Sequence, residues 1–303
     1  MHCCDPEPAH KIALIAFKRG HDTMSKSQPM ALAHAADLIS QADALVVTAG
    51  AGMGVDSGLP DFRGTEGFWK AYPALGREQM DFHAIASPAA FRERPQRAWG
   101  FYGHRFELYR QTQPHPGFGI LKRWGEKMPL GHAVFTSNVD GQFQKAGFDP
   151  RVVHECHGSI HHLQCLNACT PAIWPADGFE PEVDAAQCRL LSPLPRCPSC
   201  GALARPNILM FYDADWLEER EAQQAARMEQ WLSHISRPVV VEIGAGTAIP
   251  SVRRFGQRIV HEFGGRLVRI NPRESAVPSS QDIGLASGSL QALAGIDRIL
   301  VSG

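Results

Sequence analysis

Short apolar runs recur along the chain and are separated by stretches with helical spacing. The runs occupy residues 44–47, 132–136, 238–243, 266–270 and 298–301. Such runs, rich in Val, Ile and Leu, are typical of parallel strands, because both faces of a parallel sheet are covered by helices. The pattern therefore predicts an α/β protein built on a doubly wound parallel sheet.

Two segments interrupt this alternation. Residues 64–115 are rich in aromatic side chains and are predicted to be helical, with Ser87 as an N-cap and Pro88 in the first helical position. Residues 160–204 contain five of the eight cysteines and many prolines, and they have no clear periodicity. We interpret both segments as insertions that form a smaller lobe against the main sheet.

A glycine-rich turn follows the first predicted strand. Gly50, Ala51 and Gly52 stand at the carboxyl end of that strand, where small residues let backbone N–H groups approach a pyrophosphate. The spacing is GxGxG instead of GxGxxG, with Val55 in the place of the third glycine, which disfavours a hydride-transfer enzyme. The glycine spacing alone is compatible with a nucleotide site or with an ordinary loop turn.

A polar turn follows the strand predicted at residues 132–136. Asn138 and Asp140 fall at its carboxyl end, which is where ligands bind in open α/β sheets. An amide and a carboxylate can hydrogen-bond ribose hydroxyls and a carboxamide, the groups that a nicotinamide riboside presents. The alternative is that these side chains cap the helix that follows.

His157 is the candidate for acid–base chemistry among fourteen histidines. An imidazole is suited to accept a proton near neutral pH, and Gly158 after it opens space for a substrate. For any single histidine, a structural role in the core or on the surface is the ordinary alternative. His154 is the nearest competitor, but no glycine follows it.

Two cysteine pairs lie in the second insertion: Cys165 with Cys169, and Cys197 with Cys200. In a chain without secretory features, closely spaced cysteines favour a metal over disulfides. Four thiolates close a tetrahedral shell around zinc, so such a site is structural. Chance placement is the alternative, and Cys188 could replace one member of the set.

Composition narrows the function classes. The chain has 303 residues, with 30 Lys and Arg against 31 Asp and Glu, for a formal net charge of −1. This balance gives no signal for nucleic-acid binding. Since no apolar run approaches the roughly 18 residues of a membrane span, a cytoplasmic enzyme without a membrane partner is the expectation.

The sequence of residues 50–63, GAGMGVDSGLPDFR, resembles the first motif of the sirtuins, GAGxSxxSGIPDFR. Sirtuins are NAD-dependent protein lysine deacylases. Residues 136–147 resemble their second motif, TQNIDxLHxxAG, and His157 falls where the family has its general base. The resemblance implies NAD contacts from Gly50, Ala51, Gly52, Asp61, Phe62, Arg63, Ser137, Asn138, Asp140, Gly244, Gly246 and Asn271.

The resemblance also implies a domain organisation, in which a sirtuin-type catalytic domain at residues 29–303 follows an N-terminal extension at residues 1–28. The expected fold is a Rossmann-like parallel-sheet domain with a smaller zinc-binding and helical lobe. We expect the large lobe at residues 29–63, 116–159 and 205–303, and the small lobe at residues 64–115 and 160–204.

The implied reaction consumes NAD. The acyl oxygen of a modified lysine attacks the nicotinamide ribose carbon as nicotinamide leaves, and His157 then deprotonates a ribose hydroxyl. Products are the free lysine, nicotinamide and O-acyl-ADP-ribose, and the partners are acyl-lysine proteins or peptides. The chain departs from the family pattern at Gly54 and Ser137, where the family has serine and glutamine, and at Tyr212, where it has glycine.

Tyr102 and Arg105 are candidates for contacting the acyl group. They are three residues apart and share one helix face, so a phenol and a guanidinium could together hold a carboxylate. The alternative is a core tyrosine and a solvated arginine. With Ala86, this YxxR pattern resembles the sirtuins that remove succinyl, malonyl and glutaryl groups, and we hypothesise a preference for acidic acyl-lysines.

Two rival functions remain open at this stage. The same site could transfer ADP-ribose to another acceptor or hydrolyse NAD. A non-catalytic NAD-sensing protein could also retain the cofactor residues.

Overall fold

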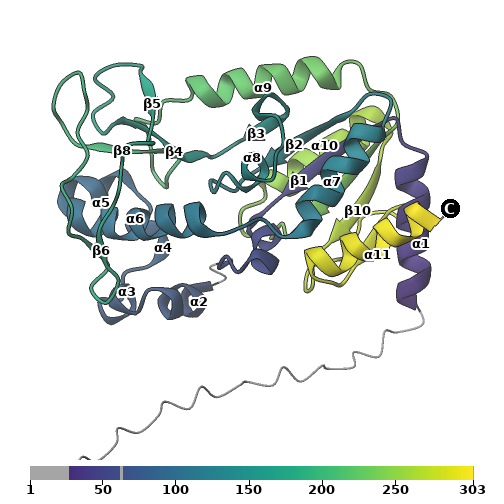
Figure 1. Cartoon of the computed structure of the whole chain (residues 1–303), viewed down its shortest axis with the longest axis horizontal. Coiled ribbons are helices and arrows are strands. Elements are labelled where there is room, and N and C mark those ends of the chain that lie inside the picture. Colours follow the sequence, from purple (N-terminus) through teal and green to yellow (C-terminus); the bar gives the residue numbers. More distant parts are fainter. Residues whose placement is uncertain (1–26, 62–63, 303) are drawn as a thin grey trace, which may run out of the picture.

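A computed structural model describes residues 27–61 and 64–302 of the chain (Figure 1). Most of the expected N-terminal extension, residues 1–28, therefore lies outside the described residues. Two of the expected cofactor residues, Phe62 and Arg63, also lie outside them.

The centre of the molecule is a six-stranded parallel sheet with the strand order β11-β10-β9-β1-β2-β3. From β1 the chain runs outward to β2 and β3, and it then returns to the other side of β1 to form β9, β10 and β11. This reversal creates a topological switch point between β1 and β9, and the doubly wound sheet is confirmed. The strands are β1 Ala44–Ala49, β2 His132–Thr136, β3 Val153–Glu155, β9 Pro238–Ile243, β10 Arg266–Ile270 and β11 Ile283–Leu285.

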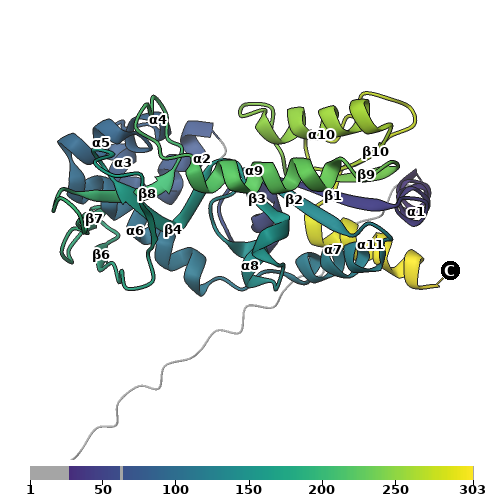
Figure 2. The same ribbon diagram turned by 90° about the horizontal axis from the view of Figure 1, so that it is seen from above.

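Helices cover both faces of this sheet (Figures 1 and 2). Successive side chains of a strand point to opposite faces, so Leu45 and Val47 enter one core while Val46 enters the other. None of the helices within 27–61 and 64–302 is long and apolar enough to cross a bilayer. The first core packs under α1 Ser27–Ser40, α7 Pro116–Lys127 and α11 Ser289–Ser302, and the second under α9 Glu219–Leu232 and α10 Ser251–Phe263.

The two insertions form a second lobe with an aromatic core of its own. Its longest helix, α6 Pro95–Gln111, buries Trp99, Phe101 and Phe106 in that core. The predicted N-cap is confirmed, since the Ser87 Oγ accepts a hydrogen bond from the Ala90 N–H at 3.3 Å. The other helices are α2 Gly64–Ala71, α3 Pro73–Arg77, α4 Phe82–Ile85 and α5 Pro88–Glu93, and the strands are β4 Gly158–Cys165, β5 Ile173–Pro175, β6 Val183–Asp184, β7 Arg189–Leu190 and β8 Ala204–Ile208.

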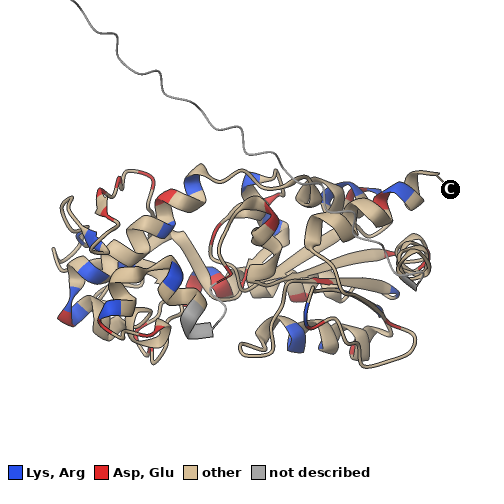
Figure 3. Cartoon of the chain, turned by 90° about the horizontal axis from the view of Figure 1, so that it is seen from below, with Lys and Arg blue, Asp and Glu red and all other residues tan. Residues whose placement is uncertain are grey.

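Three short helical turns complete the described elements: η1 Ala51–Ser57, α8 Gln142–Lys145 and η2 Pro150–Val152. The first two directly follow β1 and β2, at the edge of the sheet where the strands end. Lys and Arg are interspersed with Asp and Glu over both lobes (Figure 3), as the balanced composition predicts.

One predicted strand is wrong. Residues 298–301 belong to α11, in which Ala292, Leu293 and Ile296 are buried with helical spacing. The apolar pattern did not indicate two of the six strands, β3 and β11, because each has only three residues. A run of four apolar residues is compatible with a strand or with a helix. Here the side chains of α11 pack against α1 and α7, and this packing favours the helix.

Candidate active site

The glycine loop, residues 50–58, meets the loop after β9 at the switch point of the sheet. The Gly50 N–H donates to the Ile243 carbonyl at 3.0 Å, and the Gly52 N–H donates to the Gly244 carbonyl at 3.1 Å. A Cβ atom on Gly52 would lie 2.6 Å from the Gly244 Cα. Gly244 itself has a φ of +62°. Both positions therefore require glycine, for the close approach and for the left-handed backbone.

A strand-end cleft of about 110 Å³ lies beside this contact. Its shape is held by Asp56, whose Oδ2 accepts hydrogen bonds from the Ser289 Oγ at 2.6 Å and the Leu290 N–H at 2.7 Å. Ligands bind at such a crevice in open α/β sheets. The cleft is lined by Gly52, Val55, Asp56, Asp61, Ile243, Gly244, Ile270, Pro272, Arg273, Ser287, Gly288 and Ser289.

Sequence reasoning missed one side of this cleft. Arg273 follows β10, and Ser287 and Ser289 follow β11. The serines could have been found from a Ser-Gly-Ser turn at the end of a strand, but β11 itself was not predicted. Asn271, which was predicted, is buried and shapes these loops: its Nδ2 donates to the Ala245 carbonyl at 2.9 Å.

The loop after β2 is tied to the glycine loop. The Asn138 Nδ2 donates to the Gly50 carbonyl at 3.0 Å, and the Ser137 N–H donates to the Ala49 carbonyl at 3.2 Å. Among the described residues the Asn138 Oδ1 accepts no hydrogen bond, so it is available as an acceptor. Gly246, in contrast, faces open space, and no close contact requires a glycine there.

Asp140 is buried below this loop. Its Oδ1 accepts a hydrogen bond at 2.9 Å from the N–H of Gln142, the first residue of α8, but the N-cap position of that helix is Gly141. Burial raises the pKa of the Asp140 carboxyl from 3.8 to about 6, and the Gln142 N–H and the charge of Arg105 oppose the rise. The Asp140 carboxyl group therefore changes its charge close to neutral pH.

His157 lies in the turn between β3 and β4, next to the loop after β2. Burial lowers the pKa of the imidazole below its usual 6.5, while a hydrogen bond with the Ser137 backbone and the charge of Glu221 oppose the shift. Its Nε2 is 3.4 Å from the Oγ of Ser251, the first residue of α10. No sequence signal pointed to Ser251, because it comes from a helix far away in the chain.

Gly158 is needed beside His157 for steric reasons. It has a φ of +79°, and a Cβ atom there would lie 2.1 Å from the Asn207 carbonyl oxygen. The competitor His154 is occupied elsewhere, because its Nε2 pairs with the Glu221 carboxylate and its ring packs edge-on against Phe135. Of the two histidines, only His157 lies in the turn beside the loop after β2.

Tyr102 and Arg105 both lie in the aromatic core of the small lobe. Tyr102 stacks on Phe91 with ring centroids 5.5 Å apart, and burial raises the pKa of its phenol to about 12. The Arg105 guanidinium donates to the Tyr109 hydroxyl through Nε at 2.8 Å and lies 5.1 Å from the centroid of the Phe101 ring. Tyr102 is thus a core residue, but Arg105 is buried and not the solvated charge of the alternative interpretation.

The four predicted cysteines form one cluster, in which all Sγ atoms lie within 4.8 Å of one another. The Sγ atoms of Cys165 and Cys200 are 3.7 Å apart, and those of Cys169 and Cys197 are 3.6 Å apart. Zinc–sulfur bonds of about 2.3 Å in a tetrahedron require sulfur atoms about 3.8 Å apart. The cluster therefore fits a structural zinc ion, and Cys188 is not part of it.

Comparison with known proteins agrees with this architecture. The Sir2 family model matches residues 50–241. A protein of Pyrococcus furiosus named NAD-dependent protein deacylase is 31% identical over 83% of this chain and 90% of its own length. A Pseudomonas aeruginosa protein named NAD-dependent protein deacylase 1 is 32% identical over 78% of this chain and 86% of its own length.

Solved structures share the fold. A mutant Sir2 homologue in complex with ADP-ribose has a TM-score of 0.67, is 24% identical, and covers 92% of this chain and 97% of its own. A Sir2 homologue in complex with NAD has the same TM-score and identity, with coverages of 88% and 93%. At these identities the likeness shows the fold alone.

Removing the buried charge of Asp140 should stabilise the protein. Because its pKa is higher in the folded state than in the unfolded chain, the proton-linked stability is fully present below pH 3.8 and is lost as the pH rises through about 6. We expect Asp140→Asn to raise the free energy of unfolding by roughly 1–3 kcal/mol at pH 8 and by little at pH 4. Denaturant unfolding at both pH values measures this.

Asp149 provides the control for that experiment. It is an exposed carboxylate whose pKa is lowered by its hydrogen bond to Arg151. Asp149→Asn should not stabilise the protein at pH 8. A loss of stability in Asp140→Asn at pH 8 would show that the buried charge is balanced by its surroundings.

Zinc removal should destabilise the small lobe. We expect Cys200→Ser to lose most of the roughly one zinc ion per chain and to unfold at a lower temperature, because metal affinity contributes directly to folding. Cys156→Ser, outside the cluster, is the control and should keep its zinc. Metal analysis and thermal unfolding measure both effects, and a wild-type protein without zinc would refute the assignment.

Proposed function

This chain belongs to the Sir2 family, and we propose that it uses NAD to remove acyl groups from lysine side chains of proteins. The relatives named NAD-dependent protein deacylase support this proposal. The observation that carries it is a continuous set of hydrogen bonds at the strand ends. The Cys156 N–H, next to His157, donates to the Thr136 carbonyl at 2.9 Å, and Asn138 in the loop that follows donates to the Gly50 carbonyl in the glycine loop.

The strand-end cleft is the proposed site for the adenosine and pyrophosphate of NAD. Its fit rests on the absence of side chains at Gly52 and Gly244, which lets the two loops approach closely enough to close one side of the cleft. Because Gly50 and Gly52 donate their N–H groups to β9 and its loop, the Ala51 N–H at the start of η1 is the loop donor left for a phosphate oxygen.

His157 is the proposed general base. Its lowered pKa keeps the imidazole neutral at pH 7, and therefore able to accept a proton from a ribose hydroxyl. The contacts with Ser137 and Ser251 hold the ring from two sides. NAD, when bound, supplies the ADP-ribosyl group that accepts the acyl group as nicotinamide is released.

Asn138 and Asp140 are proposed to hold the nicotinamide riboside. The Asn138 Oδ1 can accept a hydrogen bond from a ribose hydroxyl, since only the Nδ2 is used within the described protein. Asp140 can form one hydrogen bond with a carboxamide. Because its pKa is raised to about 6, the carboxyl group can donate to the carboxamide oxygen when protonated or accept from the carboxamide N–H when ionised. Both residues belong to the same loop after β2.

An acidic acyl group is the proposed substrate class. Arg105 is buried, and its positive charge acts to lower the pKa of Asp140. The charge therefore acts on the nicotinamide side of the proposed site. In such a dry environment a guanidinium attracts a carboxylate more strongly than it does at the surface. We propose Tyr102 and Arg105 as the residues that select succinyl-, malonyl- or glutaryl-lysine.

We also propose that the chain functions as one catalytic domain of two lobes. The proposed large lobe comprises residues 29–63, 116–159 and 205–303. The proposed small lobe comprises residues 64–115 and 160–204. The separate hydrophobic cores support two lobes, but Ile208 and Met210 of the inferred large lobe belong to the core of the small lobe.

Replacing His157 tests the reaction itself. With NAD and a panel of acyl-lysine peptides, we expect wild-type protein to form nicotinamide and O-acyl-ADP-ribose, and His157→Ala to lose at least about 100-fold in rate while still binding NAD. His154→Ala is the control and should keep most of the rate. Mass spectrometry identifies the products. Nicotinamide release without an acyl substrate would instead indicate NAD hydrolysis or ADP-ribosyl transfer.

Replacing Arg105 tests the acyl class. We expect Arg105→Met to lower kcat/KM for a succinyl-lysine peptide by about 10- to 100-fold, because a charge-assisted hydrogen bond is lost, and to leave acetyl-lysine activity largely unchanged. Arg123→Met on α7, half-exposed, is the control. If wild type prefers acetyl-lysine and the substitution spares succinyl-lysine, Arg105 does not select the acyl group.

A further inference from the structure

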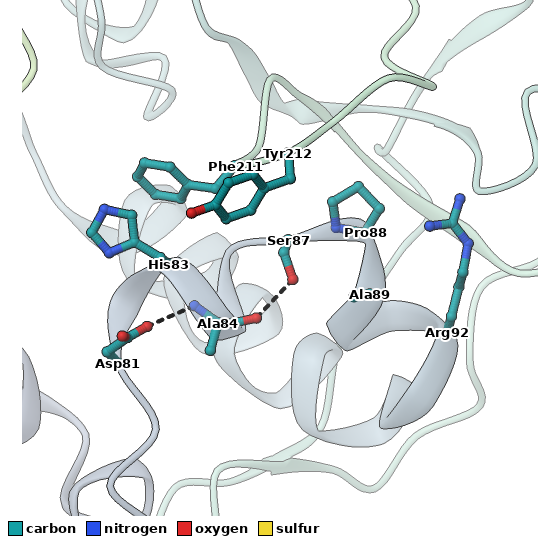
Figure 4. Close-up of a pocket in the computed structure, with 9 residues that line it drawn as sticks. All are labelled: Asp81, His83, Ala84, Ser87, Pro88, Ala89, Arg92, Phe211 and Tyr212. Atoms are coloured by element: carbon teal, nitrogen blue, oxygen red, sulfur yellow. Dashed lines mark hydrogen bonds between the residues drawn. The ribbon is translucent and has the colours of Figure 1, made fainter.

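A second pocket, of about 360 Å³, lies in the small lobe, away from the strand-end cleft. Figure 4 shows it between the turn that joins α4 to α5 and the two aromatic side chains of Phe211 and Tyr212. His83, Ser87 and Arg92 complete its walls. None of these residues has a role in the chemistry proposed above.

The main chain connects this pocket directly to His157. The Leu209 N–H donates to the His157 carbonyl at 3.0 Å, and the Phe211 N–H donates to the Ala86 carbonyl at 3.0 Å. Three residues of extended chain span at most about 10 Å, so Tyr212 lies within a short peptide's reach of the proposed base. A protein segment with its acyl-lysine beside His157 can thus bring a neighbouring side chain to the pocket.

Tyr212 is the unusual residue of this region. Its φ is +58°, a left-handed conformation that is costly for a tyrosine, and its side chain is 91% exposed. The turn is imposed by its surroundings, because the next residue, Asp213, forms a fully buried ion pair with Arg205 at 2.8 Å. The exposed ring contributes almost no packing to the isolated molecule, so contacts within the protein do not compensate its strain.

The chemistry of the pocket indicates what it binds. The Asp81 Oδ1 accepts a hydrogen bond from the Ala84 N–H at 2.8 Å, and the Ser87 Oγ donates to the Ala84 carbonyl at 2.8 Å, as Figure 4 shows. Arg92 is paired with Asp215 at 2.6 Å. With these polar groups engaged, most of the surface that remains is aromatic and apolar.

Aromatic rings form one wall. The rings of His83 and Phe211 lie with centroids 4.1 Å apart, and Tyr212 lines the same pocket (Figure 4). Pro88 and Ala89 contribute apolar surface opposite them. Aromatic faces of this kind pack well against aromatic side chains, with an energetic gain beyond that of area alone.

We propose that this pocket binds an aromatic or large apolar side chain that flanks the acyl-lysine in the substrate protein, with Tyr212 as its outer wall. The inference rests on the proposed deacylase function and specifies the substrate further. It makes Tyr212 a specificity-determining residue that acts on substrate binding and leaves the chemical step unchanged.

Peptide kinetics test the proposal. The substrates are acyl-lysine peptides with Phe, Ala or Asp at each of the positions flanking the lysine, and a blocked acyl-lysine without neighbours. For wild type we expect a KM about ten-fold lower for a Phe-flanked peptide than for its Ala counterpart, with similar kcat. Tyr212→Gly should abolish this difference without lowering the unfolding temperature, and Tyr212→Phe should keep it.

A second variant guards against an indirect effect of the loop. Ala89→Trp adds bulk to the opposite wall and should also abolish the preference for Phe. The blocked acyl-lysine should be turned over equally by wild type and all three variants. A preference for Asp, or a preference for Phe that survives both Tyr212→Gly and Ala89→Trp, overturns the proposal.

Failure of the deacylase function would be visible separately. If wild-type protein does not turn over even the blocked acyl-lysine, the proposed function fails, and fluorescence anisotropy with labelled peptides then tests the pocket alone. Tighter binding of the Phe-flanked peptide that is lost in Tyr212→Gly supports the pocket. Equal binding of all peptides overturns it.

Discussion

The backbone contact between Gly52 and Gly244 is the constraint on which the rest of the site depends. It joins the loops that leave β1 and β9, the two strands at which the sheet reverses direction. Since no side chain fits between these backbones, the loops approach closely enough to close one side of a cleft. The Asn138 amide extends the connection to the loop after β2, and so to His157. Three strand ends are thereby held in one arrangement.

Burial then determines the electrostatics of this arrangement. It raises the pKa of Asp140 to about 6 and lowers that of His157, so the imidazole is neutral at pH 7 while the carboxyl group gains its charge just below neutral pH. A neutral imidazole can accept a proton, and a carboxyl group can recognise an amide. Arg105 keeps its positive charge under the same low solvent access, on the small-lobe side of the site. These departures from ordinary behaviour occur together at the proposed site, as is common in active sites.

Sequence reasoning predicted the features that depend on local pattern. The apolar runs before residues 50, 137 and 244 are strands because both faces of a central parallel sheet are buried. Cysteine spacing predicted the metal cluster because ligand chemistry limits the choice of residues. What depends on packing between distant elements was not predictable: β11 has too few residues, α11 resembles a strand at its end, and Ser251 approaches His157 only through α10.

NAD titration of two glycine variants is the most direct measurement of the central claim, that the contact between Gly52 and Gly244 forms the NAD site. Gly52→Ala forces these backbones apart, whereas Gly178→Ala adds a methyl group in open space outside the strand-end cleft. By isothermal titration calorimetry, Gly178→Ala should bind NAD within about two-fold of wild type, and Gly52→Ala, still folded by circular dichroism, should bind at least about ten-fold more weakly. Equal affinity of folded Gly52→Ala and wild-type protein would contradict the claim.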